Sequence, residues 1–295
     1  MSYILMDKVA VITGGSRGLG FGIAQAYARQ GAKVVIASRT QPSVDSALER
    51  LRASGAQASG LVCDVADLAQ VEALAEHAIR TFGRIDIWVN NAGLAGPYGP
   101  TAHIPSRIFM NVVNTNIIGT YNGSVVALRK MTAQKTGKII NLLGRGDTGA
   151  VTFQNAYSSS KVWVRNFTKA LAAEYKESGI GIFGFNPGLV ETEMISQVEA
   201  VAGFEKRLAP LRIVTLLWGN PADVPAARAV WLASDATNGK TGLMVRVLNP
   251  GFMLKRIFKT GLRWLLRHPL EMIDLKVSSI QPVAELAPVY IESES

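Results

Sequence analysis

A tyrosine and a lysine stand four residues apart at Tyr157 and Lys161. If this stretch is helical, both side chains project from one face of the same helix. A free phenol, with a pKa of about 10, is a poor acid at neutral pH, but a nearby ammonium favours the phenolate and lowers that pKa. The pair is therefore predicted to act as a general acid/base near neutral pH. The alternative is that the two residues only share a half-exposed helix face.

Length and composition favour one folded α/β unit. The chain has 295 residues, of which 48% are hydrophobic, enough for one large domain or for one domain plus an extension. A single cysteine, Cys63, excludes an internal disulfide and suits a reducing compartment. The first residues lack a signal-peptide pattern, and no apolar run has transmembrane length. We therefore expect a cytoplasmic protein.

The formal net charge is +9, from 31 Lys and Arg against 22 Asp and Glu. The basic residues are mostly scattered, and no nucleic-acid-binding module is visible. An anionic cofactor or an anionic membrane surface would account for the excess equally well. We expect no nucleic-acid partner and no metal site.

A glycine turn follows the first predicted strand, residues 8–13, and leads into an alanine-rich helix that Gly31 ends. Gly14 permits a tight turn, while Gly18 and Gly20 let the backbone approach a pyrophosphate closely. The helix N-terminus adds free N–H groups and the positive end of its dipole. The spacing differs from the Gly-x-Gly-x-x-Gly dinucleotide pattern, and the turn could be purely structural, but this strand–turn–helix context favours phosphate binding.

The second predicted strand, residues 33–37, ends at Ser38 and Arg39. Many NAD-binding folds have an acidic residue near this position, which holds the ribose 2′-hydroxyl. A guanidinium at Arg39 can instead pair with a 2′-phosphate, and Arg17 in the glycine turn could add a second charge. Unless both arginines are merely solvated, the sequence indicates NADP(H) rather than NAD(H).

Strands and helices alternate along the rest of the chain. Further strands are predicted at residues 58–63, 85–89, 138–143, 180–185 and 243–248. Helices are predicted at about residues 43–53, 67–82, 106–133 and 222–233, and the helix that carries Tyr157 and Lys161 is expected to end at about residue 178. This alternation implies a parallel sheet with right-handed crossovers, whose ligands bind at the carboxyl ends of the strands. Asn116 is unfavourable inside its helix and is expected to kink it or to hold a water.

Five motifs occur together, in one order and spacing, and give the chain a family resemblance. They are Thr13-Gly14-x-x-x-Gly18-x-Gly20, Asn90-Asn91-Ala92-Gly93, Asn116, Tyr157-x-x-x-Lys161 and Asn186-Pro187-Gly188-x-Val190-x-Thr192. From about residue 7 to residue 250 the chain resembles the short-chain dehydrogenase/reductases. The resemblance implies a Rossmann-type, doubly wound parallel sheet of about seven strands in three α/β/α layers. It also implies a nicotinamide cofactor and a homodimer or homotetramer.

The resemblance carries residue roles with it. It implies Tyr157 as general acid/base, Lys161 as its pKa-lowering partner and ribose ligand, and Asn116 on a proton-relay water. With the arguments above, the predicted cofactor contacts are Gly14, Ser16, Arg17, Gly18, Leu19, Gly20, Ser38, Arg39, Asp64, Val65, Asn91, Ala92, Gly93, Tyr157, Lys161, Pro187, Gly188, Val190 and Thr192. Residues 1–250 are then one dinucleotide-binding and catalytic domain, and residues 251–295 a C-terminal extension.

One position departs from the family pattern. The family has a serine about thirteen residues before the tyrosine, and here Gly144 falls there. Losing one oxyanion donor costs about 2.7–4 kcal/mol, a roughly 100- to 1000-fold slower reaction. Either Thr148 or Arg145 supplies the donor, or the substrate is already polarised, as an iminium or a conjugated enone would be, or the protein binds its cofactor and catalyses little.

The segment from residue 189 to residue 218 lies where the family has its substrate lid. Six apolar residues are predicted to form a stripe on one helix: Met194, Ile195, Val198, Val201, Phe204 and Leu208. This helix would either pack on the core or line a pocket for a bulky, poorly soluble carbonyl compound or alcohol. The predicted substrate contacts are Gly144, Arg145, Thr148 and Met194.

Residues 252–268 form a basic amphipathic segment that contains Trp264. Such a helix is typical of interfacial membrane contact, although it could equally dock on the enzyme or on a neighbouring subunit. The sequence as a whole indicates an NADP(H)-dependent oxidoreductase that transfers a hydride between the nicotinamide and a small-molecule carbonyl/alcohol pair. The alternative is a low-activity NADP(H)-binding regulator or scaffold whose C-terminal helix contacts a membrane or a partner.

Overall fold

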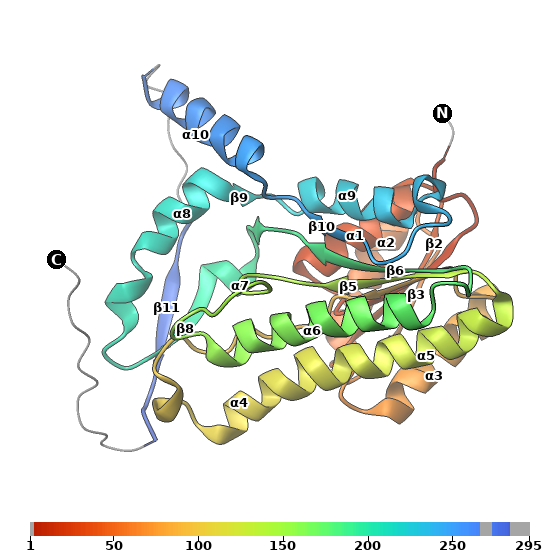
Figure 1. Ribbon diagram of the computed structural model, residues 1–295, viewed down its shortest axis with the longest axis horizontal. Helices are drawn as coiled ribbons and strands as arrows, with labels where there is room; N and C mark the ends of the chain where they lie inside the picture. The colour runs from red at the N-terminus through yellow and green to blue at the C-terminus, as the bar shows by residue number, and fades with distance from the viewer. Residues whose placement is uncertain (1–2, 266–272, 284–295) are drawn as a thin grey trace.

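The structure is a computed structural model that describes residues 3–265 and 273–283. A seven-stranded parallel sheet forms its middle layer, in the order β10-β6-β5-β4-β1-β2-β3, and helices cover both faces (Figure 1). The strands are β1 (Val9–Thr13), β2 (Lys33–Ser38), β3 (Ala58–Val62), β4 (Ile87–Asn90), β5 (Gly137–Leu142), β6 (Ile180–Asn186) and β10 (Met244–Arg246). The predicted Rossmann-type fold with about seven strands is confirmed.

The central strands are almost continuously apolar because the sheet is covered on both sides. One hydrophobic cluster lies under α1 (Gly18–Arg29), α2 (Gln41–Ala53) and α9 (Asp223–Ala233). The second lies under α3 (Leu68–Phe82), α5 (Gly119–Gln134) and α6 (Asn155–Glu174). The strand order reverses between β1 and β4, and in such sheets ligands bind in the crevice outside the carboxyl ends at this point.

The helical stretch predicted at residues 106–133 is interrupted at Asn116. It consists of α4 (Ser106–Val113), the π-helical turn η2 (Asn114–Ile118) and α5. Such π-bulges are frequent at functional sites. The predicted disturbance is therefore present, and the turn places the fully buried Asn116 side chain at the carboxyl edge of the sheet.

The lid segment does not form the single helix predicted for residues 194–208. It contains β7 (Leu189–Val190), α7 (Glu193–Ser196), β8 (Gln197–Val201), η3 (Glu205–Leu208), α8 (Pro210–Trp218) and β9 (Gly219–Asn220). The prediction is wrong because β8 pairs in parallel with a strand near the C-terminus, β11 (Lys276–Ile280), along its whole length. Tyr98 bridges to Ala200 on the other edge of β8. The β11 strand was not expected from the sequence.

Beyond the sheet, α10 (Pro250–Leu265) leaves the body beside α8 (Figure 1). The Arg256 guanidinium donates to the carbonyl oxygens of Leu217 and Gly219, which attaches the start of α10 to the end of α8. Residues 266–268 of the predicted amphipathic helix lie outside the described residues. Two short 3-10 helices, η1 (Thr101–His103) and η4 (Asp235–Thr237), complete the fold. No described helix combines the length and apolarity needed to cross a membrane.

Candidate active site

Tyr157 and Lys161 project from the first turns of α6, which begins at Asn155 beside the carboxyl end of β5. The Lys161 ammonium donates to the carbonyl oxygen of Leu142 at 2.9 Å, and its Nζ lies 5.5 Å from the centroid of the Tyr157 ring. Four residues of helical spacing thus place both groups on one face, as predicted. The structure brings the phenol and the amine together at the edge where dinucleotides bind.

The protonation of this pair differs from the sequence-based expectation. Burial, together with the nearby Asp147 carboxylate, raises the pKa of Tyr157 to about 12. Burial lowers the pKa of Lys161 to about 8, partly offset by the same carboxylate. The net effect is that the pKa of the phenol lies above its ordinary value despite the nearby amine, because desolvation disfavours the charged form of each group.

Asn116 connects two elements of the site. Its Oδ1 accepts from the Leu94 backbone N–H at 2.8 Å, and its Nδ2 donates to the Leu94 carbonyl and to the Ser160 hydroxyl, both at 3.0 Å. A Cβ added to Gly93 would lie 3.4 Å from Asn116 Oδ1 and 3.8 Å from Lys161 Nζ. The loop after β4, the π-helical turn and α6 therefore converge on one point.

Gly144, at the family's serine position, lies directly against Tyr157. A Cβ added to Gly144 would overlap the Tyr157 hydroxyl and would lie 3.5 Å from Lys161 Cγ. The Gly144 carbonyl accepts from the Asn186 side chain at 3.1 Å and from the Asp147 backbone N–H at 3.2 Å. The phenol therefore occupies the space in which a serine side chain would begin.

The other two substrate contacts predicted on this loop are Arg145 and Thr148. Arg145 and Thr148 are both exposed, and the Thr148 hydroxyl accepts from Arg246 at 3.4 Å. Within the described residues, no hydrogen bond joins either side chain to Tyr157. Met194, on α7, is 42% exposed.

Sequence reasoning missed Asp147, which is 3% exposed in this loop. Its two carboxylate oxygens accept from Arg246 at 2.6 Å and from Arg165 at 3.3 Å. Arg165 stands eight residues after Tyr157 and so shares its helix face, a signal available in the sequence. Arg246 comes from β10, and that contact could not be predicted without the sheet order.

The glycine turn has the geometry that a pyrophosphate needs. Gly14 and Gly18 have φ angles of +62° and +55°, a left-handed conformation that favours glycine. A Cβ on Gly20 would overlap the Gly14 carbonyl oxygen. The Asn91 side chain donates to the carbonyls of Thr13 at 2.9 Å and Gly14 at 3.1 Å, which fixes the turn from the loop after β4. The turn and the N-terminus of α1 therefore fit a dinucleotide phosphate.

The residues at the end of β2 fit an additional phosphate. Ser38 accepts from the Ser16 hydroxyl at 3.0 Å, and Arg39 is exposed without an ion pair among the described residues. Arg17 pairs with Glu193 of the lid at 2.5 Å, but their side chains are 72% and 54% exposed. Such an exposed pair is worth about 0–1 kcal/mol, so Arg17 can exchange partners readily.

The remaining predicted cofactor contacts border the same crevice. Asp64 follows β3 and accepts from the Ala66 backbone N–H at 3.0 Å, while the neighbouring Val65 is buried. Thr192 reaches the glycine turn, since a Cβ on Gly18 would lie 3.3 Å from its methyl group. Three further residues, Pro187, Gly188 and Val190, lead from β6 to this point; Leu19 and Ala92 flank the turn.

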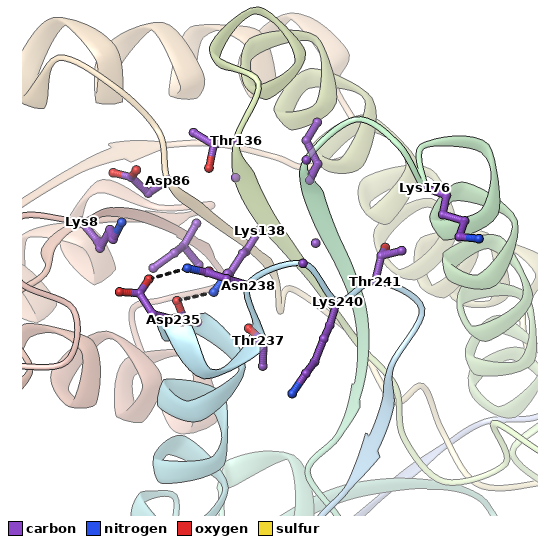
Figure 2. A pocket seen from close by; sticks show the side chains of 17 residues that line it. Lys8, Asp86, Thr136, Lys138, Lys176, Asp235, Thr237, Asn238, Lys240 and Thr241 are labelled. Carbon is purple, nitrogen blue, oxygen red and sulfur yellow. Dashed lines mark hydrogen bonds between the residues drawn. The ribbon is translucent and has the colours of Figure 1, made fainter.

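Two cavities among the described residues lie at opposite edges of the sheet. One, of about 240 Å³, lies at the opposite, amino-terminal edge of the sheet and is lined by Lys138, Asp235 and Asn238 among others (Figure 2). Lys138 there donates to the Ser234 carbonyl. The other, only about 10 Å³, adjoins Tyr157 and is bordered by Ile108 and Phe109. The hollow beside the phenol is lined mainly by apolar side chains, and its volume is about that needed by one water molecule.

Comparison with known proteins agrees with this geometry. The family model for short chain dehydrogenases matches residues 8–202. The 3alpha-hydroxysteroid dehydrogenase of Mediterraneibacter gnavus is 33% identical over 250 residues, covering 84% of this chain and 98% of that protein. The glucose 1-dehydrogenase 2 of Bacillus subtilis is 29% identical over 240 residues, covering 81% and 92%.

Solved structures with bound nucleotide are also similar. A variant of actinorhodin polyketide ketoreductase with NADPH superimposes with a TM-score of 0.74 at 28% identity, covering 81% of this chain and 95% of that one. A gluconate 5-dehydrogenase from Burkholderia cenocepacia, in complex with NADP and tartrate, gives 0.75 at 28% identity, covering 86% and 98%. This chain belongs to the short-chain dehydrogenase family and is an NADP(H)-dependent oxidoreductase.

Proposed function

We propose that this enzyme reduces the carbonyl group of a bulky, largely apolar substrate, with Tyr157 as the proton donor. The observation that carries the proposal is the position of the Tyr157 hydroxyl. It lies against Gly144, on the same helix face as Lys161, at the carboxyl edge of the sheet. The adjoining hollow has apolar walls, including Ile108 and Phe109. A substrate oxygen placed there meets a hydroxyl that retains its proton.

The protonation states of Tyr157 and Lys161 suit the reductive direction. With a pKa raised to about 12, Tyr157 holds its proton throughout the physiological range and can give it to a developing alkoxide. Lys161, whose pKa is lowered to about 8, is still mainly charged at pH 7 and stabilises the phenolate that remains. Asn116 holds the loop after β4 against α6, and we assign it to the relay that returns a proton to Tyr157.

We assign the cofactor to the crevice between the glycine turn and the lid. The turn at Gly14, Gly18 and Gly20 would hold the pyrophosphate, and Arg39 with Arg17 would hold the 2′-phosphate. Bound NADPH supplies the hydride. The lid residue Thr192 lies against the turn, so lid and cofactor site are joined.

The missing serine bears on the substrate class. Because Arg145 and Thr148 are both exposed and neither is hydrogen-bonded to Tyr157 among the described residues, we favour a substrate that needs no second oxyanion donor, such as a conjugated enone. Two of the similar proteins act by name on a steroid and on a polyketide, both bulky. For such a substrate to bind beside Tyr157, the small hollow there, about 10 Å³, must widen.

The test is NADPH oxidation, followed by absorbance, with conjugated polycyclic ketones and with small ketones such as acetone. We expect turnover of the polycyclic ketones, and we expect Tyr157→Phe to abolish it while leaving NADPH binding near normal. A Tyr157→Phe protein with most of its activity would refute the assignment of the acid. NADPH binding without turnover of any ketone would refute the proposed reaction.

A second candidate function rests on α10. Its described apolar residues Leu254, Ile257 and Phe258 are exposed, at 68%, 44% and 74%, and share one helix face. This face, next to the exposed Lys255, suits peripheral contact of a cytoplasmic protein with an anionic membrane. Co-sedimentation with anionic vesicles that persists after truncation at Pro250 would refute this role.

We also propose a division of the chain and an assembly. Residues 1–250 would form the catalytic domain, and residues 251–295 an extension that supplies β11 to the lid through its pairing with β8. Family members are commonly oligomeric, and we propose a homodimer or homotetramer here. Light scattering coupled to size-exclusion chromatography would test this, with a monomeric mass as the contradicting result.

A further inference from the structure

Asp147 is a buried carboxylate in the turn that replaces the family's serine loop. It is 3% exposed, and a carboxylate withdrawn from water to this extent is costly unless it is paired. Arg246 of the edge strand β10 and Arg165 of α6 each bind one of its oxygens, at 2.6 Å and 3.3 Å. The two guanidinium groups, which are 40% and 19% exposed, cover the carboxylate from two different elements.

The same turn packs against the catalytic face of α6. A Cβ on Gly144 would overlap the Tyr157 hydroxyl, and a Cβ on Gly146 would lie 2.5 Å from the Ser158 Cβ. The Asp147 backbone N–H donates to the Gly144 carbonyl at 3.2 Å, so the carboxylate and the glycine belong to one closed turn. A movement of Asp147 would therefore move Gly144 and the wall against which the phenol rests.

Basic side chains surround the turn, and two of them lie on the same face of α6 as Tyr157. Tyr157, Lys161 and Arg165 follow one another at intervals of four residues on α6, and β10 adds Arg246. The Asp147 carboxylate acts on both Tyr157 and Lys161 and raises the pKa of each. It opposes the loss of a proton from either group, and the two arginines weaken that effect.

We propose that Asp147 is a positioning residue, which supplies the negative charge that keeps the Lys161 ammonium protonated and holds Gly144 against Tyr157. The inference rests on the proposed role of Lys161. Burial disfavours the charged form of the Lys161 amine, so its ammonium loses a proton more readily than that of a free lysine. A fixed carboxylate in the adjacent turn compensates for this.

The test is a titration of Lys161 that needs no substrate. The full-length protein, without nucleotide, is labelled with 13Cε-lysine, and the Lys161 resonance is assigned by its loss in Lys161→Arg. In Asp147→Asn the titration midpoint should fall by about one pH unit, the lower end of the effect of a close opposite charge. In Arg246→Gln, the control that removes a positive charge from the same carboxylate, the midpoint should rise.

Each outcome decides the proposal. A midpoint unchanged in Asp147→Asn overturns it, and so does a fall in both variants, because the effect would then come from a disordered turn rather than from charge. If Asp147→Asn does not fold, as circular dichroism would show, Arg246→Gln decides alone: a rise supports the proposal, and no rise overturns it. Because the titration needs no turnover, its result is independent of the ketone assay that tests the proposed reaction.

Discussion

The Tyr157 hydroxyl fills the space in which a side chain on Gly144 would have to begin. The glycine at position 144 therefore has a structural effect of its own, because any larger residue would keep the phenol farther from β5. The side chain of Asn186, at the end of β6, donates a hydrogen bond to the Gly144 carbonyl oxygen. This bond holds the Gly144 backbone in place against the phenol. We infer that in this enzyme only the Tyr157 hydroxyl donates to the substrate oxygen, whereas the family commonly uses a tyrosine and a serine hydroxyl.

Restoring the family's serine should damage this enzyme. We expect Gly144→Ser to lower kcat at least about tenfold, because the new side chain displaces the phenol and small misplacements of catalytic groups are costly. Gly144→Ala is the matched control, since it adds the same Cβ without a hydroxyl, and it should show a similar loss. Steady-state kinetics with a polycyclic ketone checks this; a Gly144→Ser enzyme faster than the natural one would contradict it.

Cofactor preference should depend on Arg39. A hydrogen bond to a charged group is worth about 1.5–3 kcal/mol, so Arg39→Gln should weaken NADPH binding about 10- to 100-fold. Binding of NADH, which lacks the 2′-phosphate, should change little. Fluorescence titration with both nucleotides checks the prediction, and an equal loss for NADH would show that Arg39 has only a structural role.

The rate of ketone reduction should fall in alkali. The pKa of Lys161 is lowered to about 8, below the value of about 10.4 for a free lysine, so its ammonium is lost first as the pH rises. Tyr157 keeps its proton to about pH 12 and does not limit the profile below that. We expect kcat/KM for NADPH, which reports the free enzyme, to decline above about pH 8. A profile flat to pH 10 would contradict this.

The C-terminal strand should matter for the substrate and not for the nucleotide. Truncation after residue 274 removes β11 and leaves the backbone of β8 unpaired on that edge. We expect a higher KM for the ketone with NADPH binding retained, because the glycine turn and Arg39 lie outside this two-stranded sheet. Truncation after residue 283 retains β11 and is the control. Equal kinetics for the two truncated proteins would exclude β11 from the lid's function.

The sheet and the nucleotide crevice could be predicted because their signals are local. Apolar runs ended by glycines mark β1 and its turn, and Asp67 does cap α3, with its carboxylate accepting from the N–H groups of Ala69 and Gln70. The spacing of Tyr157 and Lys161 likewise places both on one face of a single helix, without help from any distant residue.

The features that were missed depend on distant partners. The strand β8 exists because β11 pairs with it, and residues 197–201 alone read equally well as helix. The raised pKa of Tyr157 follows from its burial against Gly144 and from Asp147, which the sequence does not bring together. The role of Asp147 itself requires Arg246, whose place next to the site is set by the position of β10 at the sheet edge.

The central claim is that Tyr157 gives its proton to a carbonyl oxygen during NADPH-dependent reduction. The most direct measurement is a single turnover of a conjugated polycyclic ketone by NADPH-loaded enzyme, followed in a stopped-flow instrument for the natural protein and for Tyr157→Phe. The account predicts rapid loss of NADPH absorbance in the natural protein and a rate at least about 100-fold slower in the variant, with nucleotide affinity preserved. Equal rates in the two proteins would contradict it.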